Sequence, residues 1–292
     1  MKVLIPNLSF YHFRNVAACL QTVTHSSGAE VFLWNVDQKS MIDAFDDSSP
    51  DLVFLHENQV DDAFNMLCNE MDFEYVLVGS RQNSNLPRPP SMMITSETFK
   101  KNFTNTEKVI SLKPAAKVTD VHSAKSNDRL QSEVLVLTGV VPHTPPVVDA
   151  MKSLSKAFRT KIVGDLRVDS PSYLGKVNMF QRADLIKSTQ VLVDFGSYDY
   201  LDAAYLQTAA VFGQPPLAGM EAVRTFSDIR SLVMEVKSLL NSDEQRKNYA
   251  SVIHEDTIKN HTYYHRTAEI FETLGMKDIA NDLLDFFRGL LK

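Results

Sequence analysis

EVLVLTG, at Glu133–Gly139, is a nearly continuous apolar run that ends in a glycine. KIVGD at Lys161–Asp165 and QVLVDFG at Gln190–Gly196 follow the same pattern, with segments of helical period between them. Apolar runs separated by helices are typical of a parallel sheet that is covered by helices on both faces. The second half of the chain is therefore predicted to be a doubly wound α/β domain.

The first half shows the same alternation. Its predicted strands are Lys2–Ile5, Glu30–Val36, Asp51–Leu55 and Glu74–Gly79. The rhythm then breaks at a proline-rich stretch, RQNSNLPRPP, and at a polar segment that begins at Lys117, where a domain boundary is expected. We predict two Rossmann-like doubly wound parallel-sheet domains facing a cleft, over residues 1–125 and 126–277.

Two predictions concern the end of the chain. Leu201–Phe212 is predicted as a helix that ends at Gly213, a favourable C-cap residue, and Pro215–Ala218 as a short strand after it. The terminal segment 278–292 is predicted as an amphipathic helix. Its apolar face can pack back on the first domain or pair with another chain, so a homodimer stays open.

Composition excludes several classes of protein. The net charge of −6 disfavours a dedicated nucleic-acid binder, which normally carries a basic face. No apolar run reaches the roughly 18 residues of a membrane span. The two cysteines, Cys19 and Cys68, are too few for a disulfide scaffold or a zinc site, so they indicate a reduced, cytoplasmic protein. HTYYH at His261–His265 lacks the glutamate of a zinc protease, and no metal site is predicted.

Ligands of open parallel sheets bind outside the carboxyl ends of the strands. In the first half His12, His56 and Glu57 follow predicted strands and are the candidates for a general base that deprotonates a hydroxyl. Ordinary loop polarity is the alternative. No glycine-rich loop follows the first strand, which counts against a dinucleotide-binding oxidoreductase.

In the second half the turn after Gln190–Gly196 is the first candidate for a diphosphate, because N–H groups at a helix start are unpaired. The alternative is a capped turn. Arg167 and Lys176 can stabilise a departing diphosphate, or be solvated surface charges. At the ends of the strands of the second half, the residues predicted to bind a diphosphate-containing ligand are Gly139, His143, Arg167, Lys176, Gly196, Ser197, Tyr198 and Asp202.

Three stretches carry a family resemblance. They are GKVNMFQRADLIKSTQVLVDFGS, AAVFGQPPLA and SLLNSDEQRKNYASVIHEDTIKNHTYYHRTAEIF, which together lie within residues 175–274. In order and spacing they resemble the C-terminal half of GT-B glycosyltransferases, most of all the bacterial spore-maturation type grouped with the "glycosyl transferases group 1" proteins. The first half matches only in architecture.

The resemblance implies a nucleotide-sugar donor bound by the second domain, with a UDP-sugar as the first guess, and neither metal nor cofactor. It also implies a glutamate five residues before the glycine of the second stretch, which would hold the ribose hydroxyls. Counted back from Gly213, that position is Thr208, which can donate or accept a hydrogen bond but carries no charge.

The leading functional prediction is a metal-independent glycosyltransferase that moves a sugar to an acceptor hydroxyl. The acceptor can be a glycan, a small molecule or a modified nucleic-acid base. A degenerate, non-catalytic GT-B binding or assembly protein is the alternative, motivated by Thr208 and by acidic Asp199 and Asp202 near the expected phosphate. A nucleotide-sugar epimerase is a further alternative.

Overall fold

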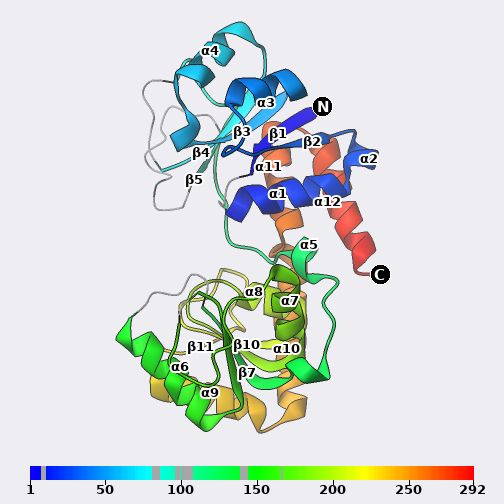
Figure 1. Cartoon of the computed structure of the whole chain (residues 1–292). Coiled ribbons are helices and arrows are strands. Elements are labelled where there is room, and N and C mark those ends of the chain that lie inside the picture. The colour runs from blue at the N-terminus through cyan, green and yellow to red at the C-terminus, as the bar shows by residue number, and fades with distance from the viewer. Residues whose placement is uncertain (8–10, 81–85, 96–98, 100–107, 139–143, 166) are drawn as a thin grey trace. The chain divides into compact units, whose positions relative to one another are not determined.

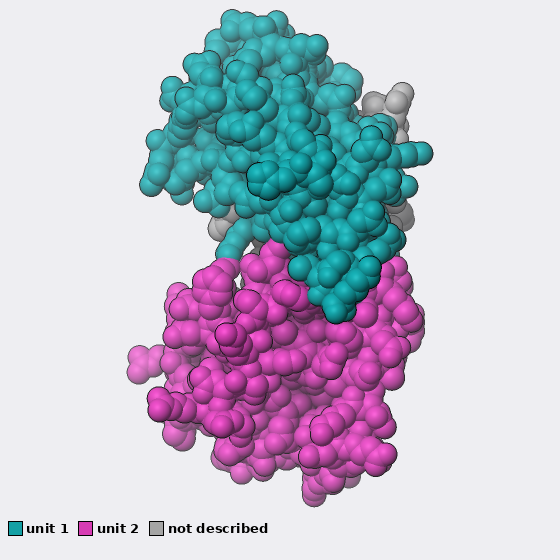
Figure 2. All heavy atoms as spheres, turned by 90° about the vertical axis from the view of Figure 1, so that its right-hand side faces the viewer, with its two compact units in different colours: residues 1–113, 263–292 teal, residues 114–262 magenta. Residues whose placement is uncertain are grey.

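A computed structural model describes the chain except for residues 8–10, 81–85, 96–98, 100–107, 139–143 and 166, and except for the side chains of residues 11 and 12. Two compact units are present. Unit 1 comprises Met1–Lys113 and Tyr263–Lys292, and unit 2 comprises Pro114–Thr262 (Figure 2). The chain thus crosses between the units twice.

Unit 1 contains a six-stranded sheet whose strand pairs are all parallel, in the order β2-β1-β3-β4-β5-β6. The strands are β1 (Lys2–Pro6), β2 (Glu30–Trp34), β3 (Leu52–His56), β4 (Glu74–Val78), β5 (Met92–Thr95) and β6 (Val109–Ser111). The central strands are almost wholly buried, as their apolar sequences predict.

Helices cover both faces of this sheet (Figure 1). They are α1 (Tyr11–Thr22), α2 (Thr24–Ser27), α3 (Met41–Ser48), α4 (Asp62–Glu70), α11 (Tyr263–Leu274) and α12 (Lys277–Leu290). One core cluster joins Leu55 and Leu77 to α3 and α4. On the other face the ring of Phe54 lies 6.2 Å from Phe13 of α1 and 6.5 Å from Phe271 of α11.

Unit 2 contains a five-stranded parallel sheet in the order β11-β10-β9-β7-β8. The strands are β7 (Ser132–Leu137), β8 (Thr160–Val163), β9 (Thr189–Asp194), β10 (Ala209–Phe212) and β11 (Arg224–Thr225). The helices are α5 (Val118–Val121), α6 (Pro145–Ala157), α7 (Met179–Ser188), α8 (Tyr200–Tyr205), α9 (Ile229–Leu240) and α10 (Asp243–Asn260).

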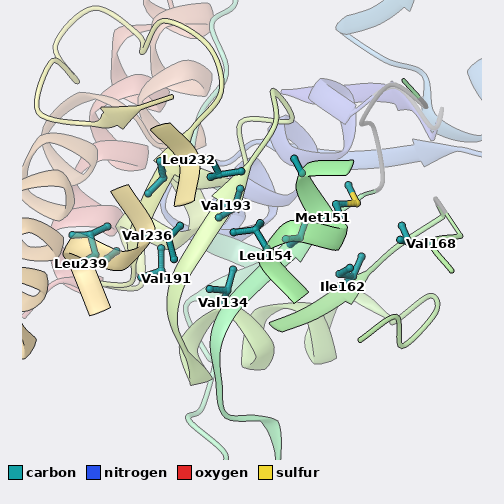
Figure 3. Packing of buried hydrophobic residues seen from close by; sticks show 14 of the residues in the cluster. Val134, Met151, Leu154, Ile162, Val168, Val191, Val193, Leu232, Val236 and Leu239 are labelled. Atoms are coloured by element: carbon teal, nitrogen blue, oxygen red, sulfur yellow. The ribbon is translucent and has the colours of Figure 1, made fainter. Parts of the chain in front are cut away.

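The core of unit 2 follows from the alternation of side chains along its strands. Val191 and Val193 of β9 point to the same face and pack against Leu154 of α6 and Leu232 of α9 (Figure 3). Helices α7 and α8 contact β9 as well, but belong to the other layer. The prediction of two Rossmann-like parallel-sheet domains is confirmed.

The predicted helix Leu201–Phe212 was wrong in its second half. α8 ends at Tyr205, Gln207 adopts a left-handed backbone with a φ of 57°, and Ala209–Phe212 is the buried strand β10. Gly213 therefore follows a strand rather than capping a helix. The predicted strand at 215–218 is absent from the described strands. In the sheet, β10 pairs with β9 on one side and with β11 on the other.

The domain boundary predicted at 125/126 compares with a division at 113/114 in the structure. Residues 114–125 belong to unit 2 because they bond to it: the N–H of Lys117 donates to Asp202 and that of Lys125 to Asp184, each over 2.8 Å. α12 belongs to unit 1, where it contacts α1, α2 and α11. Ile279, Leu283 and Phe287 on its apolar face are buried there. None of the described helices is long and apolar enough to cross a membrane.

Candidate functional site

Each unit has a point where the strand order reverses. In unit 1, β2 lies on one side of β1 and β3 on the other; in unit 2, β8 and β9 flank β7 in the same way. Crevices outside the carboxyl ends of strands at such points are where open α/β sheets bind ligands. The loops after β1, β3, β7 and β9 are therefore the first places to look for a site.

Asp194, the last residue of β9, organises the loop that follows it. Its Oδ1 accepts hydrogen bonds from the N–H groups of Gly196 (2.8 Å) and Ser197 (2.7 Å), and its Oδ2 accepts that of Tyr200 (2.9 Å). The residue is only 1% exposed. Burial raises the pKa of this carboxyl, and the charge of Asp199 adds to that effect, while the donated hydrogen bonds oppose it.

These hydrogen bonds bear on the predicted diphosphate position. The N–H groups of Gly196 and Ser197, in the loop before α8, and of Tyr200, the first residue of α8, all point at Asp194. An internal carboxylate thus accepts N–H groups that a phosphate oxygen bound at this turn would need. The alternative interpretation of the turn, a capped helix start, describes the geometry, although the capping residue is Asp194 rather than Ser197 or Asp199.

Asp199, the N-cap of α8, and Asp202, within α8, each form ion pairs with two cations. Lys117 Nζ lies 3.1 Å from Asp199 Oδ1 and 2.9 Å from Asp202 Oδ2, and Arg182 Nη1 lies 3.0 Å from Asp202 Oδ2. Arg182 also pairs with Asp199. We call these four residues the ion-pair lattice. Their side chains are between 0% and 21% exposed, so solvent screens them little.

The pKa directions within the ion-pair lattice agree with this geometry. Burial by itself would raise the pKa of Asp199, but Arg182 and Lys117 outweigh it and bring the pKa to about 2. Burial would lower the pKa of Arg182, and the two carboxylates raise it instead. Two basic and two acidic side chains therefore face one another, and the basic ones favour the ionised form of Asp199.

Unit 1 presents one fixed carboxylate at its own reversal point. Glu57 follows β3, and its Oε2 and Oε1 accept hydrogen bonds from the N–H (2.8 Å) and the Oγ (3.2 Å) of Ser80, which follows β4. Gly79 lies beside them, and a Cβ there would overlap Glu57 Oε2. The absent side chain of Gly79 makes room for this carboxylate.

His56 and His12 differ in what the structure describes. His56 ends β3 and caps the short 3₁₀ turn Glu57–Gln59, with Nδ1 accepting the N–H of Asn58 over 3.3 Å. His12 lies in the first turn of α1, and its side chain is outside the described residues. The structure thus brings His56 and Glu57 to one strand end.

No family model matches this chain, and no curated protein matches it. Solved structures do. An α-glucosyltransferase in complex with UDP and a 13-mer DNA containing an HMU base aligns with a TM-score of 0.68 at 11% identity, over 94% of this chain and 99% of that one. Sucrose-phosphate synthase from Thermosynechococcus elongatus aligns with a TM-score of 0.62 at 7% identity, over 100% and 99%.

A third similar structure is the UDP-GlcNAc 2-epimerase from Neisseria meningitidis bound to UDP-GlcNAc, with a TM-score of 0.60, 12% identity and coverage of 94% and 99%. All three span both units of this chain. The chain has the GT-B fold. The GT-B similarity extends over the first half, where the sequence resemblance covered architecture alone, and it does not single out the spore-maturation type.

Thr208 is the position counted back from Gly213, and its place in the sheet is now defined. Thr208 precedes β10, so it lies at the amino end of the sheet, where its hydroxyl donates to the carbonyl of Ile186 over 3.1 Å. The helix actually turns at Gln207, where the φ of 57° is one that glycine adopts readily. Asp202, within α8, is fully buried in the ion-pair lattice.

The predicted cations lie near the end of β8. Lys176 forms an exposed ion pair with Asp165, 2.6 Å apart, and Arg167 is exposed. The bond to Asp165 raises the pKa of Lys176. Gly139 and His143 lie outside the described residues. No group of three or more His, Cys, Asp or Glu side chains in the described part of the chain has the arrangement of a metal site.

Sequence reasoning missed Asp194, Lys117 and Arg182. Asp194 gave one local signal, an acidic residue at the end of an apolar strand, QVLVD. Lys117 gave none, because its partners lie more than eighty residues away in the chain. Arg182 lies on a helix that reads as ordinary surface.

Proposed function

We propose that this chain transfers a sugar from a nucleotide-sugar, with a UDP-sugar as the first choice, to an acceptor hydroxyl. One observation carries the proposal: structures that share the fold over nearly the whole chain were solved with UDP or UDP-GlcNAc bound. At sequence identities of 10% to 12%, the structural similarity establishes the shared fold, and it supports the ligand only by analogy.

In this proposal unit 2 binds the donor and unit 1 binds the acceptor. The β7–β9 edge of unit 2 binds the nucleotide, with Ser197 and Tyr198 beside the sugar diphosphate. Because Asp194 accepts the N–H groups of Gly196, Ser197 and Tyr200, Arg167 and Lys176 at the end of β8 are the cations proposed to bind the diphosphate. A cation there would stabilise the negative charge that develops on the leaving nucleotide.

Glu57 is the first candidate for the general base in unit 1. Its carboxylate is held by Ser80 at the end of a neighbouring strand, so it is oriented before a substrate arrives. The base would take the proton from the acceptor hydroxyl as the oxygen bonds to the sugar carbon and the nucleoside diphosphate leaves. His56 and His12 remain the other candidates for this step.

Incubation with UDP-, GDP- and ADP-glucose tests the function. We expect release of UDP from the uridine donor, faster with a mixture of oligosaccharide acceptors than with water alone, and unchanged by EDTA. Glu57→Gln should slow turnover by about 100-fold or more, with little change in UDP affinity. His25, on α2 of the same unit, offers a matched control as His25→Gln. Absence of UDP release with every acceptor would contradict the transferase proposal.

A nucleotide-sugar epimerase is a second candidate, favoured by the similarity to UDP-GlcNAc 2-epimerases. It needs no acceptor. Conversion of UDP-GlcNAc to an isomeric UDP-sugar in the absence of acceptor would support it, and product analysis by NMR distinguishes that outcome from transfer.

A non-catalytic GT-B binding or assembly protein is favoured by a different observation. Asp194 occupies the helix start, and Asp202 is enclosed by Lys117 and Arg182. If these residues close the donor position, no UDP-, GDP- or ADP-linked sugar will raise the melting temperature of the protein. A rise with UDP of several degrees at millimolar ligand would contradict this candidate.

A further inference from the structure

The chain enters unit 2 through a short segment, Pro114–Lys117, which we call the entry segment. It is fixed to the segment by which the chain leaves the unit. The N–H of Ala116 donates to the carbonyl of His261 over 2.7 Å, and Ala116 forms a parallel bridge with Thr262. The two crossing segments are therefore paired within unit 2.

Lys117 joins the entry segment to α8 through three contacts. Its N–H donates to Asp202 Oδ1 over 2.8 Å, and its ammonium group lies 3.1 Å from Asp199 and 2.9 Å from Asp202. Both the backbone and the side chain of one residue are thus bound to the same short helix. Arg182, from α7, contacts the same two carboxylates from a second element.

Asp199 continues the chain of contacts into the β9–α8 loop, residues Phe195–Asp199. The hydroxyl of Ser197 lies 2.7 Å from Asp199 Oδ2 and 2.9 Å from Asp194 Oδ1. Asp194 in turn accepts the N–H groups of Gly196, Ser197 and Tyr200. An unbroken series of hydrogen bonds and ion pairs therefore runs from Lys117 to the end of β9.

The backbone of this loop depends on such support. Gly196 has a φ of 129° and Tyr198 a φ of 61°, and a left-handed conformation is unfavourable for a residue other than glycine. Strained conformations of this kind persist only where the surroundings over-determine them. The ion-pair lattice and Asp194 are the surroundings that do so here.

We propose that Lys117 and Arg182 are positioning residues that make the entry segment and the β9–α8 loop one conformational element. Loosening either end then loosens the other, although Lys117 touches none of the loop N–H groups. Only the importance of this loop for a nucleotide rests on the proposed function. The coupling itself is a property of unit 2 and can be measured without any ligand.

Hydrogen exchange of the full-length protein, followed by mass spectrometry, tests the coupling. In Lys117→Met we expect exchange to accelerate together in residues 114–121 and 195–203, on the order of 100-fold, because two buried carboxylates then share a single cation, Arg182. Lys117→Arg keeps the charge and should restore slow exchange in both segments. Lys125→Met, an exposed lysine of the same region, is the matched control and should change neither.

Acceleration in 114–121 alone would overturn the proposal, and so would an equal effect of Lys125→Met. Peptides covering β7 and β8 report whether unit 2 stays folded. If these peptides also exchange faster in Lys117→Met, a variant at the loop end of the contacts tests the coupling instead. Asp199→Asn keeps the side-chain size, and we expect it to accelerate exchange in 114–121. Unchanged exchange there would contradict the coupling.

A second arm separates this proposal from the function. UDP added to the wild type should slow exchange in 195–203 and, through Lys117, in 114–121. In Lys117→Met it should slow only 195–203. If UDP has no effect on the wild type, the proposed function fails, while the coupling between the two segments is still decided by the variants without ligand.

Discussion

The reversal points of the two sheets share a topology and differ in chemistry. At unit 2 the carboxylates of Asp199 and Asp202 are buried, fully paired and balanced by Lys117 and Arg182. At unit 1 the carboxylate of Glu57 is half-buried and held by the N–H and hydroxyl of Ser80. The first arrangement fixes a loop, whereas the second orients a carboxylate that we propose as the general base.

Acidic residues at a strand end therefore need not oppose an anionic ligand. The sequence alone shows Asp199 and Asp202 beside the expected phosphate, which suggests repulsion. The structure adds two cations from other elements, so the lattice carries no net charge. Electrostatics at such an edge depends on partners that only the fold brings together.

The largest effect is expected where the lattice is broken. Lys117→Met should lower the free energy of unfolding by about 3–5 kcal/mol, because removing one partner strands a buried charge. Urea denaturation measures the change. The exposed control Lys125→Met should stay within about 0.5 kcal/mol of the wild type. A loss below about 1 kcal/mol for Lys117→Met would show that water reaches the lattice and would erase the contrast with unit 1.

Gly196→Ala tests the loop backbone itself. With a φ of 129°, a Cβ would be strained, and it would also lie 2.5 Å from Gln214 Nε2. We expect a loss of about 1–3 kcal/mol in the same urea experiment. The end of the exposed Gln214 side chain can move out of the way. Adding Gln214→Ala to the Gly196→Ala variant should therefore recover little of the lost free energy of unfolding. Substantial recovery would mean that the contact, rather than the backbone, limits this position.

In unit 1, Gly79→Ala should displace the carboxylate of Glu57 and cost about 1 kcal/mol, because a movable side chain relieves part of the overlap. The double variant Gly79→Ala with Glu57→Ala should recover most of the loss. Gly289 of α12 has open space around its Cβ position, so Gly289→Ala is the control and should not destabilise. Additive losses in the double variant would contradict the assigned contact.

The smallest effect is expected in the pH dependence. The pKa of Asp199 falls on folding from its ordinary 3.8 to about 2, so its ionised form stabilises unit 2 above pH 4, and that contribution is lost as the pH falls toward 2. Asp199→Asn should show a shallower loss of stability over this window. The raised pKa of Asp194 acts in the opposite sense, since its contribution falls as the pH rises. Equal slopes for wild type and Asp199→Asn would contradict the assignment.

The strands were predictable because their signal is local. DLVFL and QVLVD are apolar runs that a covered parallel sheet requires, and both became buried strands. AAVF at Ala209–Phe212 misled the prediction, because a short apolar run fits a helix as well as a strand. A glycine at position 207 would have marked the end of α8, but Gln207 occupies it.

The site was predictable only in part, and for the same reason. The strand-end rule placed His56 and Glu57 at the end of a recognisable strand, and the structure confirms that position. The lattice joins residues 117, 182, 199 and 202, which no local pattern connects. Asp202 was predicted as a donor contact, but its role as the buried partner of two cations depends on that long-range pairing.

Calorimetric titration of UDP into the full-length protein measures binding at the proposed nucleotide site. We expect a saturable one-to-one binding curve for UDP. Binding should weaken by about tenfold in Lys176→Gln and stay unchanged in Lys156→Gln, an exposed lysine on α6. No heat with UDP at millimolar concentration, or equal affinities for the two variants and the wild type, would contradict the proposed site.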